Sequence, residues 1–307
     1  MFLIAVSASL GLLRAQTGVT EIKPDLSFSV PGDLPQEIGL KLREMQVSDS
    51  GLWMLLQAQS GGFVIVRTTP SGSVQQVIRL PEGARASGLA AVRRGVATVL
   101  YKDKKPTLSQ YGFDGRALSE IPLGCFSAEA IVTFEGGAGI ICPDGTIANH
   151  SEVGQIGTYH SWARPGSLVE SLTGRRLAII DQVTGQVLLN DLAKGIISAV
   201  TPEVPELIEA RKKNETISTN LGSAPLRKQL TVMDSAADSD DVYLLVWPYQ
   251  VRDGPVVIRL GADGRVLARY RCRTPGGEQL SHHKIVVHRG FLFLGSISGS
   301  VSRYKLW

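Results

Sequence analysis

Short runs of apolar residues recur along most of the chain, and turns containing glycine separate them. Representative runs lie at 52–56, 63–66, 96–101, 242–247, 256–260, 284–287 and 291–294. Runs of this length, rich in Val, Ile, Leu and aromatic residues and bounded by turns, predict β-strands. Amphipathic helical stretches are nearly absent, so the pattern predicts an all-β protein.

The turns between these predicted strands form two series with a common spacing. The first series consists of Gly62, Lys105, Gly145, Gly185, Gly254 and Gly299. The second consists of Gly72, Gly115, Gly154, Gly195 and Gly264. Successive positions are about 40–45 residues apart, which is the period of a four-stranded propeller blade. Each series contains one longer gap, after Gly185 and after Gly195, so a single insertion explains both.

This period divides the chain into six predicted blades. They lie at about 36–82, 84–124, 126–159, 161–204 and 229–274, and from 282 to the end of the chain. The sixth blade has sequence for three strands only, so its outer strand has to come from the N-terminal region, either 19–22 or 26–30. Closure of this kind leaves no unpaired seam between the first and last blades. Residues 16–307 are therefore predicted to form one six-bladed domain.

An insertion at about 205–228 accounts for the longer gap in both series. Pro205 stands at its start, strong helix formers follow, and acidic residues precede basic ones, which predicts a helix followed by a polar loop. Surface insertions cost a fold little, so we interpret the segment as a solvated surface helix. A lid or a partner contact is the alternative.

The first 15 residues resemble a secretory signal peptide. An apolar run extends from Met1 to Leu13, and Leu13 and Ala15 occupy the −3 and −1 positions of a cleavage site, although no basic residue stands near Met1. The run is shorter than the roughly 20 residues that span a bilayer, and no other segment is long and apolar enough, so we predict no membrane span. We expect a secreted or periplasmic protein; a buried N-terminal strand is the alternative.

Composition narrows the class of protein further. Of the 307 residues, 43% are hydrophobic and 20% are charged, which is typical of a folded globular protein. The chain has 32 basic and 28 acidic residues, a net charge of +4, and the basic residues are dispersed. A nucleic-acid-binding protein would gather them in a stripe or patch, so we expect no nucleic-acid partner.

The three cysteines are Cys125, Cys142 and Cys272, and an odd number excludes complete pairing within one chain. Cys125 and Cys142 are close enough in sequence to pair in an oxidising compartment. We prefer to interpret all three as small core residues. No CxxC or His–Cys spacing indicates a zinc site.

A hairpin motif recurs at 64–74, 108–118 and 257–267. Together with the six units, it resembles the six-bladed β-propeller superfamily, and most closely the NHL-type and TolB-like propellers of secreted bacterial proteins. WD40 propellers are a poorer match, because paired Gly-His and Trp-Asp dipeptides are absent at blade spacing. The resemblance implies a monomer whose inner strands line a central channel, with ligands bound where those strands begin. It says little about function.

The inner strands are expected to begin near residues 40, 87, 128, 162, 230 and 282. Polar and aromatic residues near these starts and in the neighbouring loops form a candidate ligand-binding face: Arg43, Ser87, Glu129, Asp234, Trp247, Tyr249, Arg252, His282 and His283. Trp, Tyr and Arg dominate binding hot spots. We therefore expect a non-enzymatic scaffold that binds a protein or small molecule and needs no cofactor.

A metal-dependent hydrolase or lactonase is the alternative function. Glu44, Glu129 and Asp234 could supply carboxylates to a calcium ion at the channel mouth, and His282 or His283 could act as general base. The two histidines are adjacent in a predicted strand, so their side chains should face opposite sides. The inner strands offer no Asn, and we expect these carboxylates to be solvated or paired with arginine.

Overall fold

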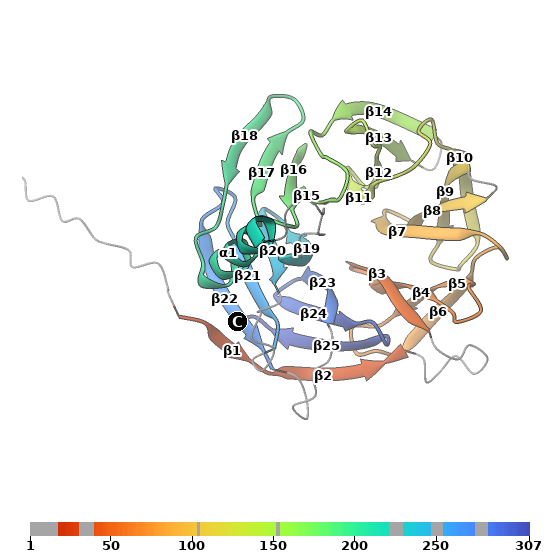
Figure 1. The fold of residues 1–307 in the computed structure, drawn as a ribbon. Helices are drawn as coiled ribbons and strands as arrows, with labels where there is room; N and C mark the ends of the chain where they lie inside the picture. Colours follow the sequence, from red (N-terminus) through yellow and green to blue (C-terminus); the bar gives the residue numbers. More distant parts are fainter. Residues whose placement is uncertain are drawn as a thin grey trace, which may run out of the picture.

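The chain folds into a ring of β-sheets around a central axis (Figure 1). This computed structural model describes residues 18–30, 40–102, 105–151, 154–220, 230–246, 254–273 and 282–307. The predicted signal peptide, residues 1–15, lies outside these ranges. Each of the six sheets is one blade, so the prediction of a six-bladed all-β propeller is confirmed.

Four strands build each of the first three blades, in chain order from the inside to the outside. Blade 1 consists of β3 (Lys41–Ser48), β4 (Gly51–Gln57), β5 (Phe63–Thr68) and β6 (Val74–Arg79). Blade 2 consists of β7 (Arg85–Val92), β8 (Gly95–Lys102), β9 (Lys105–Gly112) and β10 (Ala117–Pro122). Blade 3 consists of β11 (Ala130–Phe134), β12 (Gly137–Ile141), β13 (Thr146–Ser151) and β14 (Gly154–His160).

The second half of the ring follows the same plan with two additions at its outer edge. Blade 4 consists of β15 (Ser167–Leu172), β16 (Arg176–Asp181), β17 (Val187–Asp191) and β18 (Gly195–Val200). Blade 5 consists of β19 (Val232–Asp238), β20 (Asp241–Val246), β21 (Val256–Leu260) and β22 (Val266–Cys272). The strands that the C-terminal region gives to blade 6 are β23 (His282–His288), β24 (Phe291–Ser296) and β25 (Ser300–Lys305).

The N-terminal region supplies both additions. Strand β2 (Pro24–Ser29) pairs antiparallel with β25 and becomes the outer strand of blade 6. Strand β1 (Thr20–Ile22) instead pairs parallel with β22 and extends blade 5 to five strands. Of the two predicted closing segments, 26–30 therefore supplies the missing strand. Phe28 secures it by packing against Gly72, a turn residue with φ of +92° whose Cβ, if present, would collide with that ring.

The hydrophobic core consists of layers between neighbouring blades. The layer between blades 6 and 1, for example, joins Val286 and Phe293 to Leu42, Met45 and other buried residues of blade 1. Each inner strand also contacts the inner strand of the next blade, and β23 contacts β3 to complete the circle. Every blade thus depends on its two neighbours to bury its apolar faces.

The insertion contains a helix, α1 (Pro205–Asn220), as the sequence predicts, but the helix is packed rather than merely solvated. Leu207 is fully buried between blades 4 and 5 and contacts Gly185, where a Cβ would meet the leucine side chain at 3.0 Å. Glu206 forms an ion pair with Arg269 of β22, and both side chains are more than nine-tenths buried. The hydrophobic residues at the start of the helix explain this docking.

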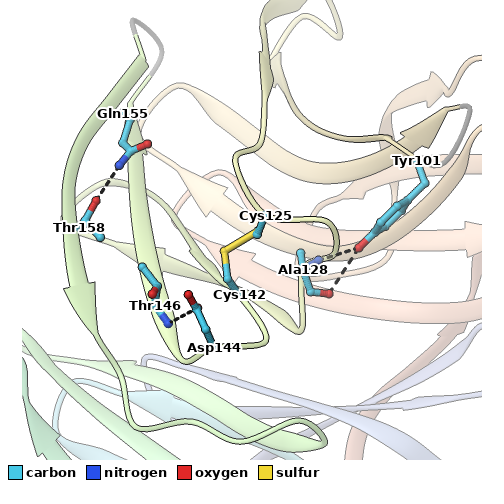
Figure 2. Close-up of a disulfide and its surroundings, with 8 residues drawn as sticks. All are labelled: Tyr101, Cys125, Ala128, Cys142, Asp144, Thr146, Gln155 and Thr158. Atoms are coloured by element: carbon cyan, nitrogen blue, oxygen red, sulfur yellow. Dashed lines mark hydrogen bonds between the residues drawn. A yellow bond between two sulfur atoms is a disulfide. The ribbon is translucent and has the colours of Figure 1, made fainter.

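Cys125 and Cys142 form a disulfide, with their Cα atoms 5.9 Å apart (Figure 2). The preferred interpretation of three unpaired core cysteines is therefore wrong for this pair. It holds for Cys272, which is free and fully buried in the core between blades 5 and 6. The disulfide joins the connection between β10 and β11 to the end of β12, so it ties the start of blade 3 to its own sheet.

Within the described ranges, no helix is both long and apolar enough to cross a bilayer.

Candidate functional site

A cavity of about 650 Å³ occupies the central channel. Residues of all six inner strands, β3, β7, β11, β15, β19 and β23, line it. Its charged lining residues are Glu44, Arg93, Glu129, Glu170, Asp234, Asp238 and Lys284. Carboxylates outnumber cationic groups in this set, so the channel is acidic although the whole chain is basic.

Lys284 lies at the centre of the charged groups. Its Nζ donates to Glu44 Oε2 at 3.0 Å and to Asp234 Oδ1 at 3.4 Å. The other oxygen of Asp234, Oδ2, accepts the backbone N–H of Ile285 at 2.9 Å. Three inner strands from three blades are thereby joined by one ammonium group.

Irregularities in the strands direct these three side chains into the channel. The register of each inner strand against its neighbour shifts immediately before Glu44, Asp234 and Lys284. Such a β-bulge inserts one residue and rotates the following side chains relative to strict alternation. Because the bulges occur at corresponding positions in blades 1, 5 and 6, the three charged groups meet at one depth.

Glu170 of β15 extends the cluster on the side of blade 4. The hydroxyl of Ser235 donates to Glu170 Oε1 at 2.6 Å. Burial raises the pKa of Glu170 to about 8 and that of Asp234 to about 7, and Lys284 opposes the shift at both. Burial acts to lower the pKa of Lys284, but Glu44 and Asp234 outweigh it and the pKa is raised. At neutral pH the cluster therefore holds a charged lysine and a protonated Glu170.

The structure brings only some of the predicted site residues to the channel. Ser87, Glu129 and Asp234 line it, as does Glu44 from the metal alternative. Arg43 is exposed and its Nε donates to Gln57 Oε1 at 2.8 Å, which places it at the rim rather than in the lining. Lys284 and Glu170 were not among the predicted residues.

The remaining predicted residues have other positions. The Nε2 atom of His283 lies 3.0 Å from the carbonyl oxygen of Leu42. The His283 side chain is not part of the channel lining. His282 begins β23, and the structure describes its backbone alone. Trp247, Tyr249 and Arg252 lie outside the described residues.

The carboxylates proposed for calcium do not fit a metal site. Glu44 and Asp234 converge, but the ammonium group of Lys284 takes the place that a cation would need between them. Glu129 is exposed and forms no part of this hydrogen-bonded group. Across the described ranges, no three His, Cys, Asp or Glu residues are close enough together to hold an ion.

Six blades of four or five strands around a polar channel define the protein as a six-bladed β-propeller. No family model matches the chain, and no curated protein matches its sequence. The chain is similar to a number of solved structures in its fold.

Among those structures is virginiamycin B lyase from Staphylococcus aureus, with 12% identity over 92% of this chain and 98% of that chain and a TM-score of 0.52. A chain of the mitotic checkpoint complex has 10% identity over 92% of this chain and 95% of its own, with a TM-score of 0.55. The WD40 repeats of RRP9 have 12% identity over 94% and 82%, with a TM-score of 0.54. At these identities the similarity supports the propeller fold and leaves function open.

Proposed function

We propose that this protein is a non-enzymatic binding scaffold that receives a ligand or partner at the mouth of its central channel, the end at which the inner strands begin. The observation that carries the proposal is the cavity of about 650 Å³ with polar residues from all six inner strands. A cavity of this size is within the range of binding sites in general. The scaffold acts as a monomer and has no nucleic-acid partner.

The state of the charged groups favours binding over catalysis. A catalytic lysine needs a lowered pKa, whereas the pKa of Lys284 is raised by its two carboxylate partners. Both oxygens of Asp234 accept hydrogen bonds, so this carboxylate is held in a fixed orientation. A group fixed in this way orients a ligand and stabilises the walls of the site.

We further propose that the protein works in a secreted or periplasmic setting. The disulfide between Cys125 and Cys142 supports this, because disulfides persist in oxidising compartments and are rare in the cytosol. The resemblance of residues 1–15 to a signal peptide points the same way.

Photo-crosslinking tests the location of the site. A photoreactive amino acid placed at Ser87 or Glu129, which line the channel, should form adducts with the partner in an extract of the native source. The same group at Glu120, exposed on the outer strand β10, is the matched control and should not. Adducts of equal yield from position 120 would show that the channel mouth is not the binding site.

The metal-dependent alternative makes the opposite prediction in a simple assay. A calcium-binding hydrolase should melt at a higher temperature in millimolar calcium, because a ligand that binds only the folded state stabilises it. Since Lys284 stands between the carboxylates, we expect no shift with calcium. A shift that disappears in the double variant Glu44→Gln, Asp234→Asn would restore the hydrolase alternative.

A further inference from the structure

A second cavity, of about 490 Å³, lies on blade 3 beside the connection between β10 and β11, away from the central channel. Its wall is largely apolar and includes Leu123, Phe126, Ile140 and Ala148. The Cys125–Cys142 disulfide also lines it (Figure 2). Polar groups lie in the rest of the lining, where Gln155 Nε2 donates to Thr158 Oγ1 at 2.7 Å. An apolar interior with a few polar groups is the usual composition of a small-molecule site.

The loop that borders this cavity is fixed at three points. The backbone N–H of Leu123 donates to the carbonyl of Pro106 at 3.0 Å, the disulfide holds Cys125, and the Tyr101 hydroxyl accepts the N–H of Ala128 at 2.9 Å (Figure 2). Phe126 stands between these anchors.

The exposure of Phe126 is unusual for its type. Its side chain is 80% exposed, which is the largest value among the large apolar residues that the structure describes as exposed. An aromatic ring normally gains free energy by burial. The anchors on either side prevent the loop from folding inward to bury it, so the ring remains available at the edge of a cavity that is already formed.

Asp144 supplies the charge of the cavity, since no other lining residue in the described part of the chain is ionisable. It occupies an Asp-Gly turn in which its Oδ1 accepts the N–H of Thr146 at 2.8 Å, and this hydrogen bond is the main reason that its pKa is lowered. The side chain is therefore ionised at neutral pH.

Two other turns have the same backbone hydrogen bonds, at Asp114 and Asp263, and each is followed two positions later by an arginine. Arg116 and Arg265 form ion pairs with these aspartates. At Asp144 the corresponding residue is Thr146, and no basic side chain of the described residues forms an ion pair with Asp144. Its carboxylate thus has no arginine or lysine partner among the described residues, and the basic group that acts on it electrostatically is the imidazole of His160.

We propose that the cavity on blade 3 beside the β10–β11 connection binds a small organic amine, with the apolar body of the ligand against Leu123, Phe126 and the disulfide and its ammonium group at Asp144. The volume is sufficient for a ligand of this kind, because drug-sized molecules occupy cavities of roughly 300–1,000 Å³. The single negative charge at the rim selects a cation over an anion of the same shape.

Three probes of matched shape test the charge preference: 4-phenylbutylamine, 4-phenylbutan-1-ol and 4-phenylbutyrate, with Kd measured by titration calorimetry on the full chain. The amine should bind about two- to fivefold more tightly than the alcohol, as expected for one partly solvated ion pair. The carboxylate should bind more weakly than the alcohol. Equal affinity for all three, or no binding of the amine, would overturn the proposal.

Substitutions locate the site. Asp144→Asn should remove the preference for the amine and leave binding of the alcohol unchanged, whereas Asp263→Asn, in the turn between β21 and β22 that has the same backbone hydrogen bonds, should change neither. Ala148→Phe should abolish binding of all three probes by filling the cavity, and Ala148→Val, a smaller change, provides the same test with partial loss if the larger one does not fold. Full amine preference in Asp144→Asn would contradict the assignment.

Discussion

Lys284 is the residue on which the charged centre of the channel depends. Its side chain is 17% exposed, and those of Asp234 and Glu44 are 9% and 24% exposed. Groups buried to this degree have lost much of their hydration, so each needs its partner to remain charged. The lysine therefore stabilises two blades other than its own.

Replacement of Lys284 by Met should destabilise the fold by about 3 kcal/mol at pH 8, because it leaves two buried carboxylates without a counter-charge. The loss should be smaller at pH 5, where Asp234, whose pKa burial raises to about 7, can take up a proton. Urea denaturation at both pH values measures the effect. Lys194→Met, whose lysine is 81% exposed, is the control and should change stability by less than about 0.5 kcal/mol. Equal behaviour of the two variants would contradict the structural role of Lys284.

Glu170 predicts a specific pH dependence. Its pKa is raised from 4.5 to about 8 by burial, so the folded state binds a proton that the unfolded state releases between these values. This proton stabilises the folded wild-type protein, and the stabilisation is fully present below pH 4.5 and is lost as the pH rises through 8. Between these values the free energy of unfolding falls by at most about 1.4 kcal/mol per pH unit.

Glu170→Gln should therefore match the wild type near pH 5 and become the more stable protein near pH 9. Denaturation midpoints across this range measure the difference, and Glu120→Gln, on an exposed strand, should show no such divergence. Parallel stability curves for wild type and Glu170→Gln would show that Glu170 is ionised throughout.

The sequence could identify Glu44, Asp234, Ser87 and Glu129 because the blade period places the beginning of each inner strand. It did not identify Lys284, because this lysine follows the expected start of the strand at 282 and the sequence does not show the bulge after His282 that sets which side chain faces the channel. Glu170 was missed for a different reason. The fourth inner strand begins at Ser167, some residues after the expected start near 162.

Helix α1 shows how an insertion becomes part of the core. Leu207→Ala should cost about 2–5 kcal/mol in the free energy of unfolding, because the leucine is fully buried between two blades and the cavity it leaves cannot easily collapse. Glu209→Ala, an exposed position of the same helix, should cost less than about 0.5 kcal/mol. Chemical denaturation of both variants measures the difference. A Leu207→Ala protein as stable as the control would show that α1 is a solvated surface helix, as predicted from the sequence.

At the level of strands, the sequence predicted the blades more completely than their outer edges. Apolar alternation and turn spacing identify strands that lie within one repeat. The parallel pairing of β1 with β22 joins segments about 250 residues apart. Strand β1 has only three residues, Thr20, Glu21 and Ile22, which is too few for a pattern that specifies a partner strand. Contacts of this range come from the closed ring and not from local sequence.

The whole molecule is a circle completed by both ends of the chain. Layers between blades supply the core, and β23 contacts β3 where the circle closes. The period alone was sufficient to predict this architecture, because each repeat is too small to bury its own apolar faces and has to pack against the next. The central channel and its charged cluster exist only while all six blades are in place.

Two N-terminal truncations test this closure most directly, with thermal and urea denaturation as the measurement. A chain beginning at residue 24 lacks β1 only and should lose little stability, since blade 5 keeps its four own strands. A chain beginning at residue 31 also lacks β2, and we predict a loss of about 3 kcal/mol or more, because blade 6 loses its outer strand and the packing of Phe28. A chain beginning at residue 31 that unfolds at the same temperature and urea concentration as the full chain would contradict the closed six-bladed ring.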